Sequence, residues 1–211
     1  MAYRHIFWDF DGTLFDTYPI TGQAFYDVLR DEYGIKENIK EIIAFMQVSM
    51  DCAFEHYKQK YRIGDNFFEK YKLLSGKYVY ELAKPFPNIQ NLCSAICKQN
   101  KYNYLYTHRS NTAFALLEKY NMYDEFTYIV TRENGFEPKP SPQALEFMIT
   151  KHFINISEAL MIGDREIDVL AAKNAGISAC LFTEETTINS KADYIIKDLK
   201  ELYSIIGLLQ M

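Results

Sequence analysis

An apolar run that ends abruptly in acids constrains the fold of this chain more than any other stretch. The letters IFW at residues 6–8 have the character of a buried strand, and DFDGT follows at residues 9–13. Because strand interiors disfavour aspartate, Asp9 and Asp11 are predicted to stand at the strand's carboxyl end, where open α/β sheets place their ligand sites. Two carboxylates beside a glycine suit a hard cation and a phosphate. Alone, this stretch is equally compatible with a strand that ends in a solvated turn.

The next seventy residues carry helical patterns throughout. Apolar side chains recur at helical spacing in four stretches, with Pro19 in the first turn of the first, Gly34 at its end and Ser49 as the N-cap of the third. The letters PFP at residues 85–87 then interrupt the chain. The predicted organisation is a core domain from residues 1–15 and 85–211, with a helical domain from residues 16–84 inserted into it.

Beyond residue 87, strands and helices are predicted to alternate. The helices are expected over 88–99, 112–120, from about 142 with Ser141 as N-cap and Pro142 in the first position, 166–175 and 198–209. The strands are expected over 102–106, 126–130, 159–162, 177–182 and 194–196. This alternation predicts an α/β fold with a mainly parallel sheet covered by helices on both faces.

Composition excludes several classes of function. The formal net charge of −5, with no cluster of Lys or Arg, argues against a nucleic-acid partner. No run approaches membrane-spanning length and no signal segment is recognised, so a cytoplasmic protein without a membrane partner is expected. The four cysteines form no C-x-x-C pair and are predicted to be core residues rather than metal ligands.

Polar residues follow several of the predicted strands. Thr107 and Asp164 stand at strand ends, as Asp9 does, and Lys139 lies in a loop that leads into a helix. Because the carboxyl ends of parallel strands share one rim, these residues are expected to converge. A carboxylate can attack phosphorus, while a cation, a lysine and a hydroxyl stabilise the transferred oxygens. The rim is therefore predicted to be a phosphoryl-transfer site.

Four motifs in this order resemble the haloacid dehalogenase superfamily of phosphohydrolases. They are DFDGT at 9–13, LYT at 105–107, KPSP at 139–142 and GDREID at 163–168. The resemblance covers essentially the whole chain, because residues 16–84 stand where a helical cap domain is inserted in one branch. It implies a Rossmann-like core, a cap that closes over the site on hinges near residues 15–18 and 84–87, and a small phosphorylated metabolite as the substrate.

The same resemblance implies roles for individual residues. Asp9 is the expected nucleophile and Asp11 the general acid–base. Mg²⁺ is expected on the Asp9 carboxylate, the Asp11 backbone carbonyl and Asp164, with Asp168 in or next to the metal shell. Two further residues, Thr107 and Lys139, are expected to bind the phosphate, and Lys139 also shields the charge of Asp9.

Several alternatives stay open at this stage. Both His108 and Arg109 depart from the residues common after the second motif. One interpretation is that both contact the substrate's phosphate or a second anionic group, and His108 is predicted to bind phosphate. The alternative is that both merely begin the next loop and helix. A β-phosphoglucomutase-like sugar phosphomutase is the alternative activity, disfavoured because residues 18–22 contain no histidine. A non-catalytic binding relative is the other alternative. A receiver domain, by contrast, would be shorter and have no helical insert. The sequence gives no indication of oligomeric state.

Overall fold

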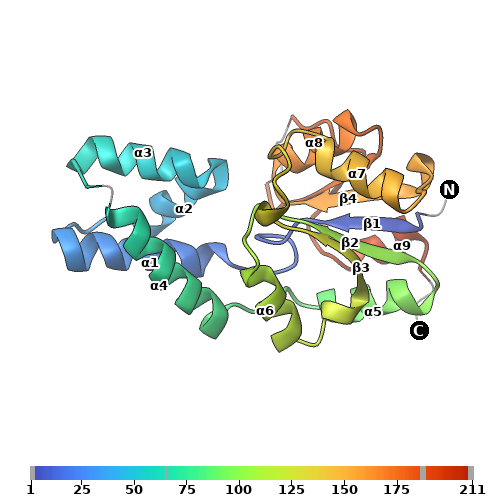
Figure 1. Cartoon of the computed structure of the whole chain (residues 1–211), viewed down its shortest axis with the longest axis horizontal. Coiled ribbons are helices and arrows are strands. Elements are labelled where there is room, and N and C mark those ends of the chain that lie inside the picture. The colour runs from blue at the N-terminus through green and yellow to red at the C-terminus, as the bar shows by residue number, and fades with distance from the viewer. Residues whose placement is uncertain (1–2, 65, 186–188, 209–211) are drawn as a thin grey trace. The chain divides into compact units, whose positions relative to one another are not determined.

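The chain divides into two units in the computed structural model, which describes residues 3–64, 66–185 and 189–208 (Figure 1). The core unit joins Met1–Phe15 to Pro85–Met211, and the helical unit is Asp16–Lys84. Among the described residues, no helix combines the length and apolarity needed to cross a membrane.

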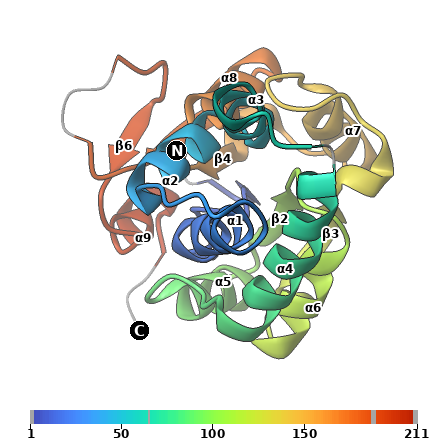
Figure 2. The same cartoon turned by 90° about the vertical axis from the view of Figure 1, so that its left-hand side faces the viewer.

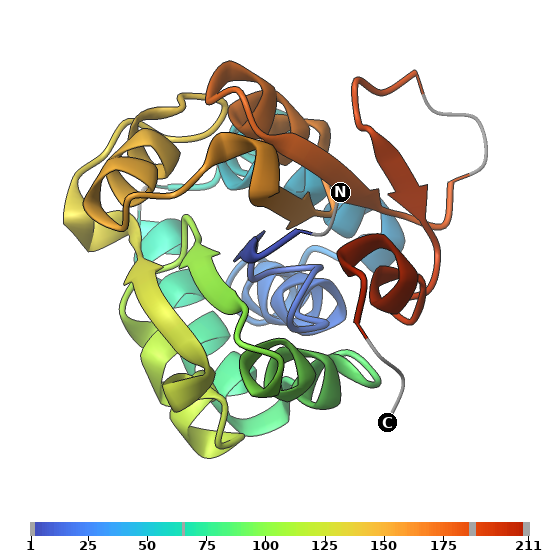
Figure 3. The same ribbon diagram turned by 90° about the vertical axis from the view of Figure 1, so that its right-hand side faces the viewer.

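Six parallel strands form the sheet of the core unit. They are β1 (His5–Trp8), β2 (Tyr102–Tyr106), β3 (Phe126–Val130), β4 (Ala159–Gly163), β5 (Ser178–Phe182) and β6 (Tyr194–Ile196). Their order across the sheet is β3-β2-β1-β4-β5-β6, with every neighbouring pair parallel (Figure 3). In this register Trp8 pairs with Leu105 of β2 and Ile162 of β4. The ends of β1, β2 and β4 therefore lie side by side, and the predicted fold class is confirmed.

Helices cover both faces of this sheet. The helices of the core unit are α5 (Ile89–Lys98), α6 (Thr112–Lys119), α7 (Gln143–Lys151), α8 (Glu166–Asn174) and α9 (Glu201–Ile206), and the short 3₁₀ turns are η1 (Tyr123–Glu125), η2 (Arg132–Asn134) and η3 (Ile156–Glu158). Helices α7 and α8 lie on one face, while α5 and α9 lie on the other (Figures 1 and 3). On the first face, Phe7 and Tyr104 pack in a cluster that includes residues of α7 and α8.

A buried polar network ties α5 to the second face. The indole N–H of Trp8 donates to Oδ1 of Asn103 at 2.9 Å, and Nδ2 of Asn103 donates to the Cys93 carbonyl at 3.0 Å. The Asn103 amide also contacts Sγ of Cys97 at 3.3 Å. All four cysteines are free: Cys93 and Cys180 are buried, whereas Cys52 and Cys97 are half-buried. Full burial was predicted for all four and is wrong for the last two.

Predicted helix boundaries are also wrong by one or more residues, and α9 begins at Glu201 where a start at 198 was expected. Helix α7 begins one residue later than expected, with Pro142 as its N-cap. The Pro142 carbonyl accepts from the Glu146 N–H at 2.9 Å. Helix α9 ends at Ile206, because Gly207 takes the left-handed conformation at φ 70° that terminates helices. Residue 209, where that helix was expected to end, lies outside the described residues.

The described residues of the helical unit form four helices: α1 (Tyr18–Tyr33), α2 (Ile39–Val48), α3 (Met50–Tyr61) and α4 (Asn66–Leu82) (Figure 2). Helix α1 ends at Gly34 with φ 67°, and the Ser49 side chain caps α3 by accepting from the Cys52 N–H at 2.9 Å. Aromatic packing forms the interior, where the Phe25 ring lies 4.6 Å from that of Phe67 and 5.4 Å from that of Tyr57, centroid to centroid. Helix α1 packs against both α2 and α4.

We expect two glycine-to-alanine substitutions in this unit to change stability in opposite directions. A Cβ on Gly22 of α1 would lie 2.5 Å from Cγ1 of Ile43 in α2, so Gly22→Ala should lower the free energy of unfolding by about 1–3 kcal/mol through overpacking. A Cβ on Gly76 of α4 would meet nothing within 4 Å, so Gly76→Ala should raise it by about 0.5–1 kcal/mol. Denaturant unfolding of both variants measures the difference. Equal effects would show that α1 and α2 pack less closely than described.

Candidate active site

The loop after β1 presents the first acids of the site. The Asp9 N–H donates to the Ile162 carbonyl of β4 at 2.9 Å, so the strand pairing continues up to the acid itself. Beyond it, Gly12 has φ 81°, a conformation that other residues rarely adopt, and its N–H donates to the Phe15 carbonyl at 2.9 Å. The rings of Phe10 and Phe15 stack at 4.7 Å beneath this turn. Asp9 is thereby held at the sheet edge with little freedom.

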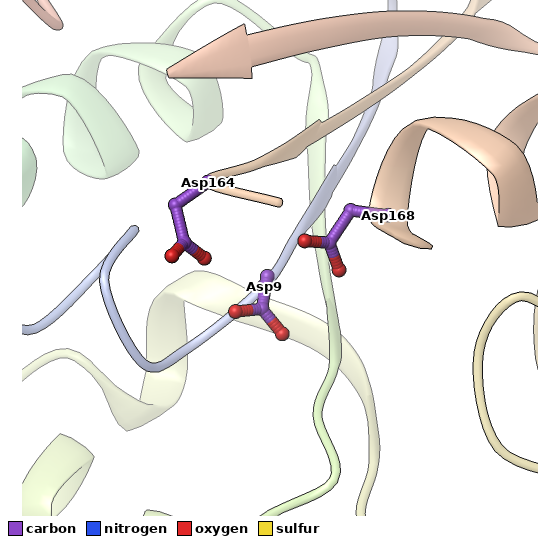
Figure 4. A group of neighbouring side chains, drawn as sticks. All are labelled: Asp9, Asp164 and Asp168. Atoms are coloured by element: carbon purple, nitrogen blue, oxygen red, sulfur yellow. The ribbon is translucent and has the colours of Figure 1, made fainter. Parts of the chain in front are cut away.

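Three carboxylates converge above the ends of β1 and β4 (Figure 4). One oxygen each from Asp9, Asp164 and Asp168 lies within 4.8 Å of the others. Asp9 follows β1, Asp164 follows β4, and Asp168 stands in the first turn of α8. The structure thus brings together residues that are separated by up to 159 positions in the sequence.

Lys139 neutralises part of this charge. Its side chain is 0% exposed, and Nζ donates to Oδ1 of Asp9 and, at 2.7 Å, to Oδ1 of Asp168. The ammonium also lies 4.7 Å from the centroid of the Tyr106 ring, a distance suited to a cation–π contact. Lys139 therefore joins its own loop to the Asp9 loop and to the first turn of α8, three segments that are far apart in sequence.

Burial and these charges shift the acid–base equilibria of the site. Burial raises the pKa of Asp9 to about 6; Lys139 opposes the rise, and the Asp168 carboxylate adds to it. Burial acts to lower the pKa of Lys139, but the Asp168 and Asp9 carboxylates outweigh it and hold that pKa above its ordinary value. The lysine is consequently charged at neutral pH.

Asp168 is a fully buried partner of the lysine rather than a solvated helix-end acid. Its Oδ1 accepts from Lys139, while its Oδ2 accepts from the Arg165 N–H at 3.1 Å and so satisfies a free amide of the first turn of α8. The carboxyl group packs directly on Gly163, where a Cβ would come within 2.3 Å of Cβ of Asp168. Only glycine at position 163 allows this close approach.

The donor set suits a hard divalent cation. Three carboxylates are only partly neutralised here by Lys139, and Oδ2 of Asp9 is buried with no hydrogen-bond partner among the described residues. A buried, unsatisfied carboxylate oxygen is costly unless something binds it. Oxygen ligands from a few carboxylates are what Mg²⁺ prefers. Asp9 and Asp164 fit this role, and Thr13 supports Asp164 through a hydroxyl contact of 3.5 Å to Oδ1.

Asp11 takes part in a separate ion pair that was not predicted. Nε of Arg109 contacts Oδ1 and Oδ2 of Asp11 at 3.1 and 3.2 Å, and Nη2 also contacts Oδ1. The sequence analysis considered Arg109 as a contact for the substrate's phosphate or a second anionic group, and not as a partner of Asp11. Nothing in its spacing indicated Asp11, which lies 98 residues away.

The two remaining predicted residues follow β2. Thr107 is buried, and its Oγ1 accepts from the Arg109 N–H at 3.0 Å, which leaves the hydroxyl proton able to be donated. In His108, Nε2 accepts from the Lys139 N–H at 2.8 Å. Burial, together with the nearby Lys139 and Arg165, lowers the pKa of His108 to about 4, so the ring is neutral at pH 7. Only Nδ1 of His108 is then available to donate a bond to a phosphate.

Comparison with known proteins places this geometry in context. A family model described as haloacid dehalogenase-like hydrolase matches residues 6–182. A phosphoglycolate phosphatase from Vibrio parahaemolyticus is 26% identical over 96% of this chain and 95% of its own, and a pyrophosphatase PpaX from Oceanobacillus iheyensis is 23% identical over 98% of each. The crystal structure of a hydrolase from Streptococcus pneumoniae TIGR4 is 30% identical, with a TM-score of 0.69 over 99% of this chain and all of that one.

The raised pKa of Asp9 predicts a stability that depends on pH. A carboxyl whose pKa is higher in the folded state than in the unfolded state stabilises the fold at low pH, where it is protonated. For Asp9 this contribution is complete below pH 3.8, the unfolded pKa, and is lost as the pH rises through about 6, the folded pKa. In chelator at pH 8, Asp9→Asn should therefore raise the free energy of unfolding by about 1–3 kcal/mol. The gain should shrink below pH 6 and vanish near pH 4.

Denaturant unfolding between pH 4 and 8 measures this difference. Added Mg²⁺ should stabilise the wild-type protein more than the Asp9→Asn variant, because the variant lacks one ligand. A variant that is less stable than wild type at pH 8 in chelator would contradict this description of the charges around Asp9.

Proposed function

Because the chain belongs to the haloacid dehalogenase-like hydrolase family, as its motifs predicted, we propose that it is a Mg²⁺-dependent phosphatase of small phosphomonoesters. The observation that carries the proposal is the buried Asp9 carboxylate, held by Lys139 beside Asp164 and Asp168 at the sheet edge. Such a carboxylate is restrained in position and kept from bulk water, as a nucleophile requires.

Asp9 is the proposed nucleophile. A carboxylate oxygen attacks phosphorus, the bond from phosphorus to the ester oxygen breaks, and an aspartyl-phosphate forms on Asp9. Lys139 keeps Asp9 ionised for the attack, since its ammonium opposes the effect of burial on the pKa of that carboxyl. The same ammonium stabilises negative charge on the transferred oxygens.

Asp11 is the proposed general acid–base. In the first step it gives a proton to the departing alkoxide, which leaves as an alcohol. As a carboxylate it then takes a proton from water, whose oxygen attacks phosphorus and breaks the bond to Asp9. The products are inorganic phosphate and the free Asp9 carboxylate, so one ester and one water are consumed per turnover. Asp11 suits this role because its side chain is 28% exposed, open enough to exchange protons.

The metal would be held by Asp9, Asp164 and the backbone carbonyl of Asp11. When bound, Mg²⁺ would neutralise charge on the phosphoryl oxygens. We assign Asp168 to positioning Lys139, because Oδ1 of Asp168 already accepts from the lysine and Oδ2 from the Arg165 amide. Thr107 is assigned to phosphate binding through its hydroxyl proton, and His108 through Nδ1.

A small phosphorylated acid is the proposed substrate class, and diphosphate, an anhydride rather than an ester, is the second candidate. The relatives named as phosphoglycolate phosphatase and pyrophosphatase are similar over nearly the whole chain, and both names denote small anionic phosphates. We assign the helical unit Asp16–Lys84 the role of a cap domain that controls access, since it is inserted between the Asp9 loop and the rest of the core unit.

We expect phosphate release from a panel of small phosphomonoesters and diphosphate to require Mg²⁺ and Asp9. Chelator should abolish turnover, and Asp9→Asn should lower kcat by about 10³-fold or more, because it removes the nucleophile. Asp124→Asn, which removes an exposed carboxylate elsewhere in the core unit, is the matched control and should leave kcat unchanged.

Two results would count against the proposal. Undiminished turnover by Asp9→Asn would exclude this residue as the nucleophile. Failure of the wild-type protein to release phosphate from any member of the panel would exclude the proposed substrate class.

A further inference from the structure

The Arg109 guanidinium forms several contacts with the carboxylate of Asp11, the proposed general acid–base. Its Nε reaches both oxygens of Asp11, and its Nη2 reaches Oδ1 as well. The contact to Oδ2, at 3.2 Å, is the longest of the three. With the arginine side chain 13% exposed and that of Asp11 28% exposed, the pair is shielded from water more than a surface salt bridge is. Such a forked contact restricts the rotation of the carboxylate as well as its position.

Arg109 is itself fixed at three points. Its N–H donates to the Thr107 hydroxyl at 3.0 Å, and its carbonyl accepts from the Arg132 N–H at 3.1 Å. The guanidinium carbon lies 5.5 Å from the centroid of the Phe10 ring, which stands between Asp9 and Asp11 in the sequence. An arginine anchored by its backbone and by a ring can hold its partner in one place.

The two acids of the first motif are thus held by different cations. Lys139 pairs with Asp9, whereas Arg109 pairs with Asp11. Two carboxylates two residues apart would otherwise compete for the same buried ammonium. Each of the two carboxylates therefore has a cationic partner of its own.

We propose that Arg109 is a positioning residue that holds Asp11 where it can exchange protons with the ester oxygen and with water. This inference rests on the proposed phosphatase function. It requires Oδ2, the oxygen with the longest arginine contact, to face the reacting atoms while Oδ1 stays in the fork. The alternative is that Arg109 binds the substrate directly.

A double-mutant cycle separates these two roles. If Arg109 acts through Asp11, then Arg109→Gln should lower kcat by about 10- to 100-fold with KM changed less than about threefold, and the effect should disappear in an Asp11→Asn background. If Arg109 binds substrate directly, the variant should raise KM, and the effects of the two substitutions should multiply. Multiplying effects would overturn the inference.

The leaving group provides a second readout. A p-nitrophenolate departs without a proton, whereas an alkoxide needs one from Asp11. Arg109→Gln should therefore slow release of the alcohol from an alkyl phosphate more than release of p-nitrophenolate in a single turnover, as Asp11→Asn should. An equal loss for both esters would overturn the inference, because a structural role or a substrate-binding role predicts it.

Two further variants control for losses of activity that do not come from the contact with Asp11. Arg109→Lys keeps the charge without the fork and should restore only part of kcat. Lys119→Gln removes an exposed cation elsewhere in the core unit and should match wild type. Thermal unfolding of each variant monitors the fold, and unfolding of both Arg109 variants would overturn the inference in favour of a structural role. Absence of wild-type turnover on every ester would instead overturn the proposed function and this inference with it.

Discussion

One buried lysine between two buried carboxylates is the interaction on which the rest of the site depends. Lys139 joins the loop after β1, the loop before α7 and the first turn of α8, because its ammonium contacts both Asp9 and Asp168. Burying an ammonium is costly unless a carboxylate pairs with it, and Lys139 keeps Asp168 as a partner even where Asp9 is replaced. The surrounding fold is arranged to sustain this group. Gly163 allows α8 to approach, and the α8 amide at Arg165 binds the second oxygen of Asp168.

The distribution of charge around that lysine explains how one rim can hold several acids. Asp9, Asp164 and Asp168 together exceed the charge of Lys139, so the cluster retains a negative excess that suits a divalent cation. Asp11 is not one of these three carboxylates and pairs with Arg109 instead. Within the proposed mechanism, this separation gives adjacent carboxylates different tasks, since one stays beside the lysine and the other stays partly open to water.

The sequence predicted the parts of the site that depend on local pattern. Strand ends after residues 8, 106 and 162 followed from apolar runs, and parallel pairing then brought Asp9, Thr107 and Asp164 to the same edge. What the sequence did not indicate depends on contacts between distant segments. Examples are the Arg109–Asp11 pair and the burial of Asp168, whose place in a first helical turn is favourable even for a solvated acid. The late start of α7 was missed because Pro142 suits both the N-cap and the first helical position.

The most direct test of the central claim is to locate the phosphoryl group during turnover. The protein would be mixed with its best phosphomonoester in Mg²⁺, quenched in acid within one turnover, digested and mapped by mass spectrometry. Covalent catalysis by the lysine-held carboxylate predicts one added phosphoryl group on Asp9, formed as the alcohol is released and lost as phosphate appears. A phosphoryl group on another residue would contradict it. So would unmodified Asp9 during a burst of alcohol release that precedes phosphate.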